Sequence, residues 1–181
     1  MSMPKNGMKN KKALFLDRDG VICEALPRGQ YLTRWEEFKL FPGIRGLIDE
    51  AKNKGYFVIV VTNQPQISRG MVSEEEVISI NNKMNELLDM KLDAIYYCPH
   101  RNEDNCDCRK PKPGMLLKAE KDFEIDFSES FFLGDSDKDA KPGKTVGCKT
   151  IFLKNEHNGE ELKNCSPDFI VESLEEAREI I

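Results

Sequence analysis

The sequence reads Ala13-Leu14-Phe15-Leu16-Asp17-Arg18-Asp19-Gly20-Val21 near its start, an apolar run that ends in two carboxylates and a glycine. Alternate side chains of an extended strand share a face, so we expect Asp17 and Asp19 on the same side, and Gly20 allows a sharp turn. Like charges this close repel each other unless a cation or a proton lies between them. The stretch therefore predicts a divalent metal beside a carboxylate nucleophile of the kind that forms an aspartyl-phosphate.

Two simpler interpretations of this stretch are an acidic turn and a calcium-binding loop. A calcium loop of the EF-hand type needs a third oxygen ligand before its glycine and a glutamate near its end. The residues around Gly20 lack that pattern. The acidic turn stays open on these residues alone, so other parts of the chain must decide.

Length and charge exclude several classes of protein. A chain of 181 residues can form a core without disulfides, and we predict a disordered leader over residues 1–10 and a single domain over residues 11–181. The net charge of -5 argues against nucleic acid as a partner. No apolar stretch has the length of a membrane span, and no apolar signal core follows Met1. We therefore expect a soluble, cytoplasmic monomer that binds neither nucleic acid nor membrane.

Apolar runs typical of strands alternate with helical patterns along the chain. Strands are expected at residues 13–16, 57–61, 94–97, 131–133, 150–153 and 169–171. Helices are expected over residues 43–54, after the capping box that begins at Ser73, over residues 115–123, and from Ser173 onward. Continuous apolar strands separated by helices predict a three-layer α/β protein with a Rossmann-like parallel sheet.

Polar residues follow the second and fourth of these strands, and ligands of parallel sheets bind at such strand ends. Thr62-Asn63-Gln64 offers a hydroxyl and two amides that can donate hydrogen bonds to phosphate, although a turn or helix cap is the better explanation of these residues taken alone. Asp135 is placed to complete an oxygen-rich magnesium site with Asp17, and Asp139 to orient its neighbours or a metal-bound water. The alternative is an acidic helix N-terminus.

A cluster of possible metal ligands lies between the third strand and the third helix. Cys98-Pro99-His100 is followed after five residues by Cys106-Asp107-Cys108. Three cysteines and a histidine are a common set for structural zinc, and without an export signal the cluster favours zinc over disulfides or free thiols. Zinc here would hold the loop that leads to Arg109 and Lys110, two cations that could stabilise a phosphoryl group. A solvated basic pair is the alternative.

Together these residues resemble the haloacid dehalogenase superfamily of aspartate-nucleophile phosphatases. Its four motifs are similar, in order, to Asp17-Arg18-Asp19-Gly20-Val21, Thr62, Lys110, and Gly134-Asp135 with Asp139. The cysteine cluster followed by Arg109-Lys110-Pro111 resembles a narrower branch, the D-glycero-D-manno-heptose 1,7-bisphosphate phosphatases and the histidinol-phosphate phosphatases.

Within that branch, different details favour different substrates. Thr62-Asn63-Gln64 leading to Ile67-Ser68-Arg69-Gly70 resembles the heptose enzymes, whereas the short five-residue loop between His100 and Cys106 resembles the histidinol-phosphate enzymes. Pro65-Gln66 departs from the heptose pattern of a small residue and glycine, and Pro142 interrupts a segment that is usually helical.

The resemblance implies a magnesium-dependent phosphatase with loops in place of a large cap domain. Its expected substrate is a small phosphorylated metabolite, with removal of the 7-phosphate of the heptose bisphosphate favoured over hydrolysis of histidinol phosphate. Asp17 is expected to attack phosphorus, while Asp19 protonates the leaving oxygen and then activates water. Magnesium is expected between Asp17, the Asp19 backbone carbonyl and Asp135, with Thr62 and Lys110 on the phosphate oxygens.

The resemblance also assigns substrate binding to a wider set of side chains, namely Asn63, Gln64, Arg69, Arg109 and Ser136, with Arg28 as a further candidate. A phosphotransferase with the same covalent intermediate stays open. A zinc-stabilised binding module without catalysis also stays open. Such a module is expected to lack one of the four central groups, but the chain has them all: Asp17, Asp19, Lys110 and Asp135.

Overall fold

The computed structural model describes residues 11–27 and 29–181. The leader predicted over residues 1–10 and the proposed substrate contact of Arg28 lie outside the described residues.

The described residues form one parallel sheet with the strand order β3-β2-β1-β4-β5-β6. The strands are β1 (Ala13–Leu16), β2 (Phe57–Asn63), β3 (Ala94–Cys98), β4 (Phe131–Gly134), β5 (Lys149–Leu153) and β6 (Phe169–Val171). The predicted parallel sheet is confirmed, and every predicted strand is present. Because β1 lies between β2 and β4, the carboxylates that follow it lie beside the polar ends of both neighbours.

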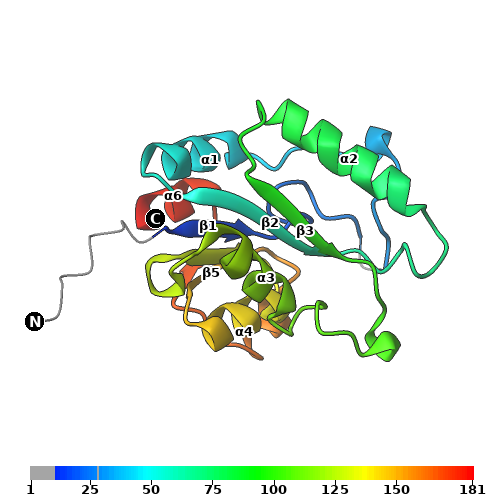
Figure 1. The fold of residues 1–181 in the computed structure, drawn as a ribbon. Coiled ribbons are helices and arrows are strands. Elements are labelled where there is room, and N and C mark those ends of the chain that lie inside the picture. Colours follow the sequence, from blue (N-terminus) through cyan, green and yellow to red (C-terminus); the bar gives the residue numbers. More distant parts are fainter. Residues whose placement is uncertain (1–10, 28) are drawn as a thin grey trace, which may run out of the picture.

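Helices cover both faces of the sheet (Figure 1). One face carries α1 (Ile44–Asn53), α2 (Glu74–Leu87) and α6 (Leu174–Ile180), and the other carries α3 (Gly114–Phe123) and α4 (Asp137–Val146). The remaining helices are short: α5 (Gly159–Leu162), η1 (Trp35–Glu37), η2 (Asn102–Asp104) and η3 (Phe127–Glu129). The predicted three-layer architecture is confirmed.

The alternation of side chains along β1 explains why both faces are covered. Leu14 and Leu16 belong to the apolar cluster under α1, α2 and α6, whereas Phe15 belongs to the cluster under α3. All four residues of β1 are fully buried. A strand with no exposed face is stable only at the centre of a sheet that is covered on both sides. Asp17, the next residue after β1, therefore lies among the ends of the central strands.

Helix α4 runs through Pro142, although the sequence suggested an interruption there. Proline removes one N–H, which would otherwise bond to the carbonyl of Lys138 in the first turn. Lys138 is exposed, so water can satisfy that carbonyl. The helix therefore continues, and Asp139 in its first turn is held in place. Among the described residues, no helix is both long and apolar enough to span a bilayer.

Candidate active site

Asp17 is the first residue after β1, and its position is fixed by the neighbouring strand. Its backbone N–H donates to the Leu133 carbonyl of β4 at 3.1 Å. The chain then turns sharply at Gly20, which has a φ of +88°, and a Cβ there would lie only 2.1 Å from Oδ2 of Asp135. Glycine is therefore required both for the turn and for the approach of the Asp135 carboxylate.

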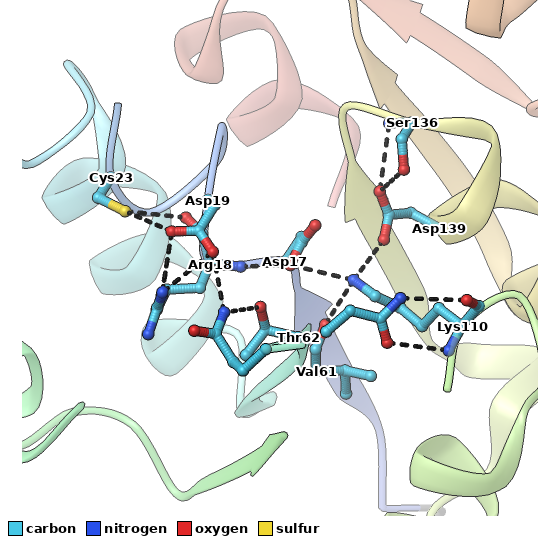
Figure 2. Close-up of polar contacts among 11 residues, drawn as sticks. Asp17, Arg18, Asp19, Cys23, Val61, Thr62, Lys110, Ser136 and Asp139 are labelled. Atoms are coloured by element: carbon cyan, nitrogen blue, oxygen red, sulfur yellow. Dashed lines mark hydrogen bonds and ion pairs between the residues drawn. The ribbon is translucent and has the colours of Figure 1, made fainter. Parts of the chain in front are cut away.

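Lys110 lies at the centre of the site, where it joins two carboxylates (Figure 2). Its Nζ is 2.6 Å from Oδ1 of Asp139 and 3.0 Å from Oδ1 of Asp17, and it donates to the Val61 carbonyl at 2.8 Å. Burial alone favours the neutral amine, but the charges of Asp139 and Asp17 outweigh it and raise the pKa of Lys110. The side chain is therefore a buried, permanently charged ammonium beside Asp17.

Asp139 holds Lys110 from the first turn of α4. Its Oδ2 accepts hydrogen bonds from the Ser136 backbone N–H at 3.2 Å and from the Ser136 hydroxyl at 2.7 Å. A Cβ on Gly134 would lie 2.1 Å from the Cβ of Asp139, so only glycine permits this approach of helix and strand. Both carboxylate oxygens of Asp139 are engaged, which makes it a positioning residue for Lys110. Ser136, which we expected to contact substrate, donates its hydroxyl to Asp139.

Three carboxylates lie together at the end of β1 and β4: Asp17, Asp135 and Asp139 have oxygens within 4.8 Å of one another. Burial raises the pKa of Asp17 to about 6, with Lys110 opposing the rise and Asp139 and Asp19 adding to it. Burial, followed by the charges of Asp139 and Asp17, raises the pKa of Asp135 well above its ordinary value. A divalent cation would relieve this repulsion.

The chemistry of Asp135 also fits a hard cation. Within the described part of the chain, no N–H or O–H group donates a hydrogen bond to its carboxylate, and no cation forms an ion pair with it. Magnesium binds carboxylate oxygens and dehydrates only partly, so it suits a site with two facing carboxylates and an open side. Asp17 and Asp135 are thus able to hold the metal, while Asp139 is occupied with Lys110.

The second carboxylate of the motif, Asp19, lies in a different environment. The guanidinium of Arg18 donates to it from Nε at 3.2 Å and from Nη2 at 3.1 Å, and Gln64 donates from Nε2 at 2.9 Å. Arg18 is fully buried and also donates from Nη1 to Oδ1 of Asn81 at 3.1 Å. Asp17 and Asp19 therefore have separate partners, an arrangement that allows two carboxylates to take different chemical roles.

Sequence reasoning missed Arg18 and Asn81. Asn81 lies one turn after Val77 on the buried face of α2, and a polar residue on an otherwise apolar stripe is the signal that could have revealed it. Arg18 gave no comparable signal, because its burial depends on α2 covering the turn after β1.

The amides after β2 position other groups in the site. Gln64 is fully buried and donates to Thr62 Oγ1 at 2.9 Å as well as to Asp19, while it accepts from Gln66 Nε2 at 2.6 Å. Asn63 accepts from the Lys110 backbone N–H at 3.0 Å and donates to its carbonyl at 3.1 Å. We expected Asn63 and Gln64 to contact substrate; in the structure the amide of Asn63 binds the Lys110 main chain, and that of Gln64 binds the side chains of Thr62 and Asp19.

The expected zinc ligands come together in the loop after β3. The thiol sulfurs of the three cysteines lie 3.1 to 3.5 Å apart, and Nδ1 of His100 is 3.3 Å from Sγ of Cys108. None of these cysteines forms a disulfide. Tetrahedral zinc with bonds of about 2.3 Å to sulfur separates its ligand atoms by roughly 3.8 Å, so the cluster needs little adjustment to hold the metal.

Two arginines expected to bind substrate have other partners. Arg109 donates from Nε to Asn102 at 2.6 Å and from Nη1 to the His100 carbonyl at 2.9 Å, so it closes the cysteine-rich loop. Arg69 is exposed and donates to the Tyr31 hydroxyl at 2.8 Å. The structure therefore brings Lys110 into the carboxylate cluster. Arg109 and Arg69 instead bind groups of the protein outside that cluster.

Comparison with known proteins shows the family to which this chain belongs. Residues 107–177 match the HAD-hydrolase-like family. The D-glycero-beta-D-manno-heptose-1,7-bisphosphate 7-phosphatase of Pasteurella multocida is 37% identical, over 94% of this chain and 97% of the relative. This chain belongs to the heptose bisphosphate phosphatase branch of the haloacid dehalogenase superfamily. The corresponding alpha-anomer phosphatase of Campylobacter jejuni is 39% identical over 82% of this chain and 86% of its own length.

A solved structure of the heptose bisphosphate phosphatase branch has the same fold. The D,D-heptose 1,7-bisphosphate phosphatase from B. bronchiseptica, complexed with magnesium and phosphate, superimposes with a TM-score of 0.84 at 27% identity. The match covers 94% of this chain and 97% of that structure.

In this member of the branch, a cavity of about 630 Å³ lies beside Asp135 and Ser136. The cavity is also lined by residues 25–27 and by four residues near α5: Asn155, His157, Asn158 and Glu161. The volume is typical of a site for a small metabolite. The cavity therefore leaves room next to the carboxylate cluster for the part of a substrate beyond its transferred phosphate.

Proposed function

We propose that this protein is a magnesium-dependent phosphatase that removes the 7-phosphate of D-glycero-D-manno-heptose 1,7-bisphosphate through an aspartyl-phosphate on Asp17. The observation that carries the proposal is the division between the two carboxylates of the first motif: Asp17 faces Lys110 and Asp135, whereas Arg18 and Gln64 hold Asp19. The 37% identity to a heptose bisphosphate phosphatase over 94% of the chain supports the substrate.

In the first step, Asp17 attacks phosphorus. Its Oδ1 accepts from the Arg18 backbone N–H at 2.7 Å and pairs with Lys110, while no described residue donates to Oδ2. Oδ2 is therefore the nucleophile. The bond from Oδ2 to phosphorus forms as the bond from phosphorus to the sugar oxygen breaks, and Asp19 gives its proton to that oxygen. Lys110 stabilises the charge on the transferring phosphoryl group.

In the second step, a water molecule attacks the aspartyl-phosphate. Asp19, now a carboxylate, takes a proton from the water, and Arg18 and Gln64 stabilise the charge that Asp19 carried between the steps. The phosphorus–Oδ2 bond breaks, inorganic phosphate leaves, and Asp17 returns as a carboxylate. Asp19 ends the second step protonated again and Asp17 ends it as a free carboxylate, so the enzyme is restored after each turnover.

The metal and the zinc loop support these residues. Asp17, Asp135 and the Asp19 carbonyl would hold magnesium, which would supply the positive charge that lets an anionic carboxylate approach an anionic phosphate. The magnesium in the B. bronchiseptica relative supports this assignment. We assign zinc to Cys98, His100, Cys106 and Cys108 as a structural metal, because the cluster offers four ligand atoms and no open position. The loop that it closes leads directly to Lys110.

The test is phosphate release by the purified protein with magnesium. Both anomers of the heptose bisphosphate are tested, because the relatives are named for different anomers. Histidinol phosphate is the alternative substrate with which they are compared. The proposal predicts release of a single phosphate per heptose molecule, with the product retaining its 1-phosphate. Asp17→Asn is the control for contaminating phosphatases. Faster hydrolysis of histidinol phosphate, or loss of the 1-phosphate first, would contradict the proposed substrate or position of cleavage.

A further inference from the structure

The main chain of Asp135 leaves the sheet at the point where its carboxylate enters the site. The ladder between β4 and β5 ends at the pair Gly134 and Phe152. The next carbonyls, those of Asp135 and Leu153, lie beyond that last pair. Buried carbonyls need hydrogen-bond donors, so another group must take over where the ladder stops.

The side chain of Asn158 supplies both donors. Its Nδ2 donates to the Asp135 carbonyl at 2.9 Å and to the Leu153 carbonyl at 2.8 Å. An amide nitrogen carries two hydrogens, so one side chain can satisfy both carbonyls. The bond to Asp135 spans 23 residues of sequence, so it links the end of β4 to the turn before α5.

Asn158 is itself held firmly. Its Oδ1 accepts from the Asn155 backbone N–H at 2.9 Å, and only 7% of the residue is exposed. All the hydrogen-bonding groups of the amide are therefore engaged, with both hydrogens directed to the two carbonyls. A side chain fixed in this way transmits the position of the turn at residues 155–158 to the main chain of Asp135.

The carboxylate of Asp135 depends on this support, because no described residue donates a hydrogen bond to it. Its orientation follows from its main chain and from the space left by the missing Cβ of Gly20. We propose that Asn158 is a positioning residue for the magnesium site, which holds the Asp135 main chain so that its carboxylate faces Asp17 before metal binds. The inference rests on the magnesium site of the proposed function.

The expected size of the effect follows from similar supporting contacts in metal sites. Loss of a hydrogen-bond partner behind a metal ligand typically weakens metal binding by about 10- to 100-fold. Asn158 acts on the backbone of Asp135 and leaves its carboxylate present, so the lower value of about tenfold applies.

The experiment compares the parent with Asn158→Ala by calorimetric titration of magnesium into zinc-loaded protein, without substrate. We expect the dissociation constant for magnesium to rise about tenfold in Asn158→Ala, and phosphatase activity to recover when magnesium is raised by the same factor. Asn85→Ala is the matched control. Asn85 also joins two segments through its amide, accepting from the Leu92 backbone N–H at 3.0 Å, but it lies on α2 outside the site.

The control separates positioning from general stability. Asn85→Ala is expected to lower the melting temperature yet bind magnesium within about twofold of the parent. Equal magnesium binding by Asn158→Ala and the parent, or an equal loss in Asn85→Ala, would overturn the inference. If Asn158→Ala does not fold, Asn158→Ser is measured with the same criteria, because its hydroxyl can still accept from the backbone of Asn155. A parent that binds magnesium but does not hydrolyse heptose bisphosphate would refute the proposed substrate and leave the role of Asn158 standing.

Discussion

Replacing Lys110 with methionine removes one ammonium and keeps an unbranched side chain of similar length. Lys110 is 3% exposed, and its Nζ contacts Asp139 at 2.6 Å, Asp17 at 3.0 Å and the Val61 carbonyl at 2.8 Å. Removing one partner of a buried ion pair costs about 3 to 5 kcal/mol. Because two carboxylates and a carbonyl lose the same partner, we expect the upper value, a loss of about 5 kcal/mol in the free energy of unfolding.

The loss should depend on pH in a defined direction. The pKa of Asp17 is about 6 in the folded protein and 3.8 ordinarily, so the folded state holds this proton more tightly than the unfolded chain. Ionisation of Asp17 therefore destabilises the fold as pH rises from about 4 to 6. Lys110 opposes this rise in pKa, and its removal moves the pKa of Asp17 higher. The difference between Lys110→Met and the parent should thus be largest at pH 8 and smaller at pH 5.

Urea unfolding at several pH values in magnesium-free buffer measures these differences. Chelators are avoided because they also remove zinc. The double variant Lys110→Met/Asp139→Asn has one buried charge fewer, so it should be more stable than Lys110→Met alone at pH 8 while remaining inactive. Two results would refute the assignment of Lys110 as the counter-ion of this cluster. One is a loss below about 1 kcal/mol in Lys110→Met, which is the range of exposed ion pairs. The other is a double variant that is no more stable than the single one.

Three further substitutions test other parts of the site. Asp17→Asn should lower turnover by at least about 10⁴-fold, as expected for loss of a covalent nucleophile, with an unchanged circular dichroism spectrum; near-normal turnover would exclude Asp17 as nucleophile. Cys106→Ser should lose zinc, measured by atomic absorption, and lower both the melting temperature and activity because the loop to Lys110 is released; full zinc content would refute the ligand set. Gln66→Met should lower the free energy of unfolding, measured by urea, by about 1 to 3 kcal/mol, because the buried Gln64 Oε1 and the Leu32 carbonyl lose the Nε2 that donates to them. The same variant should lower kcat by roughly threefold to tenfold, because Gln64 loses the amide that orients it toward Asp19; steady-state kinetics with an unchanged kcat would exclude that link.

Local patterns were sufficient to predict the strands, the main helices and the strand-end positions of Asp17, Thr62 and Asp135. An apolar run followed by polar residues can be recognised from a few neighbouring residues, and so can the spacing of the cysteine cluster. The structure lengthens β2 to Asn63 and adds α4 and α5, which the sequence did not predict. Helix α4 continues through Pro142 because the proline removes only one N–H, and Lys138, whose carbonyl that N–H would bind, is an exposed residue.

Periodicity and residue type are local properties of the chain, and they were enough to predict the class of fold and the residues that can do chemistry. The tertiary structure decided which of them meet. The order of the strands places β1 between β2 and β4, and this brings Lys110 to Asp17 and Asp139. The pairs Arg18 with Asn81 and Asn158 with Asp135 join residues 63 and 23 positions apart. Such contacts depend on how helices and strands pack against one another, and no local pattern in the sequence specifies that packing.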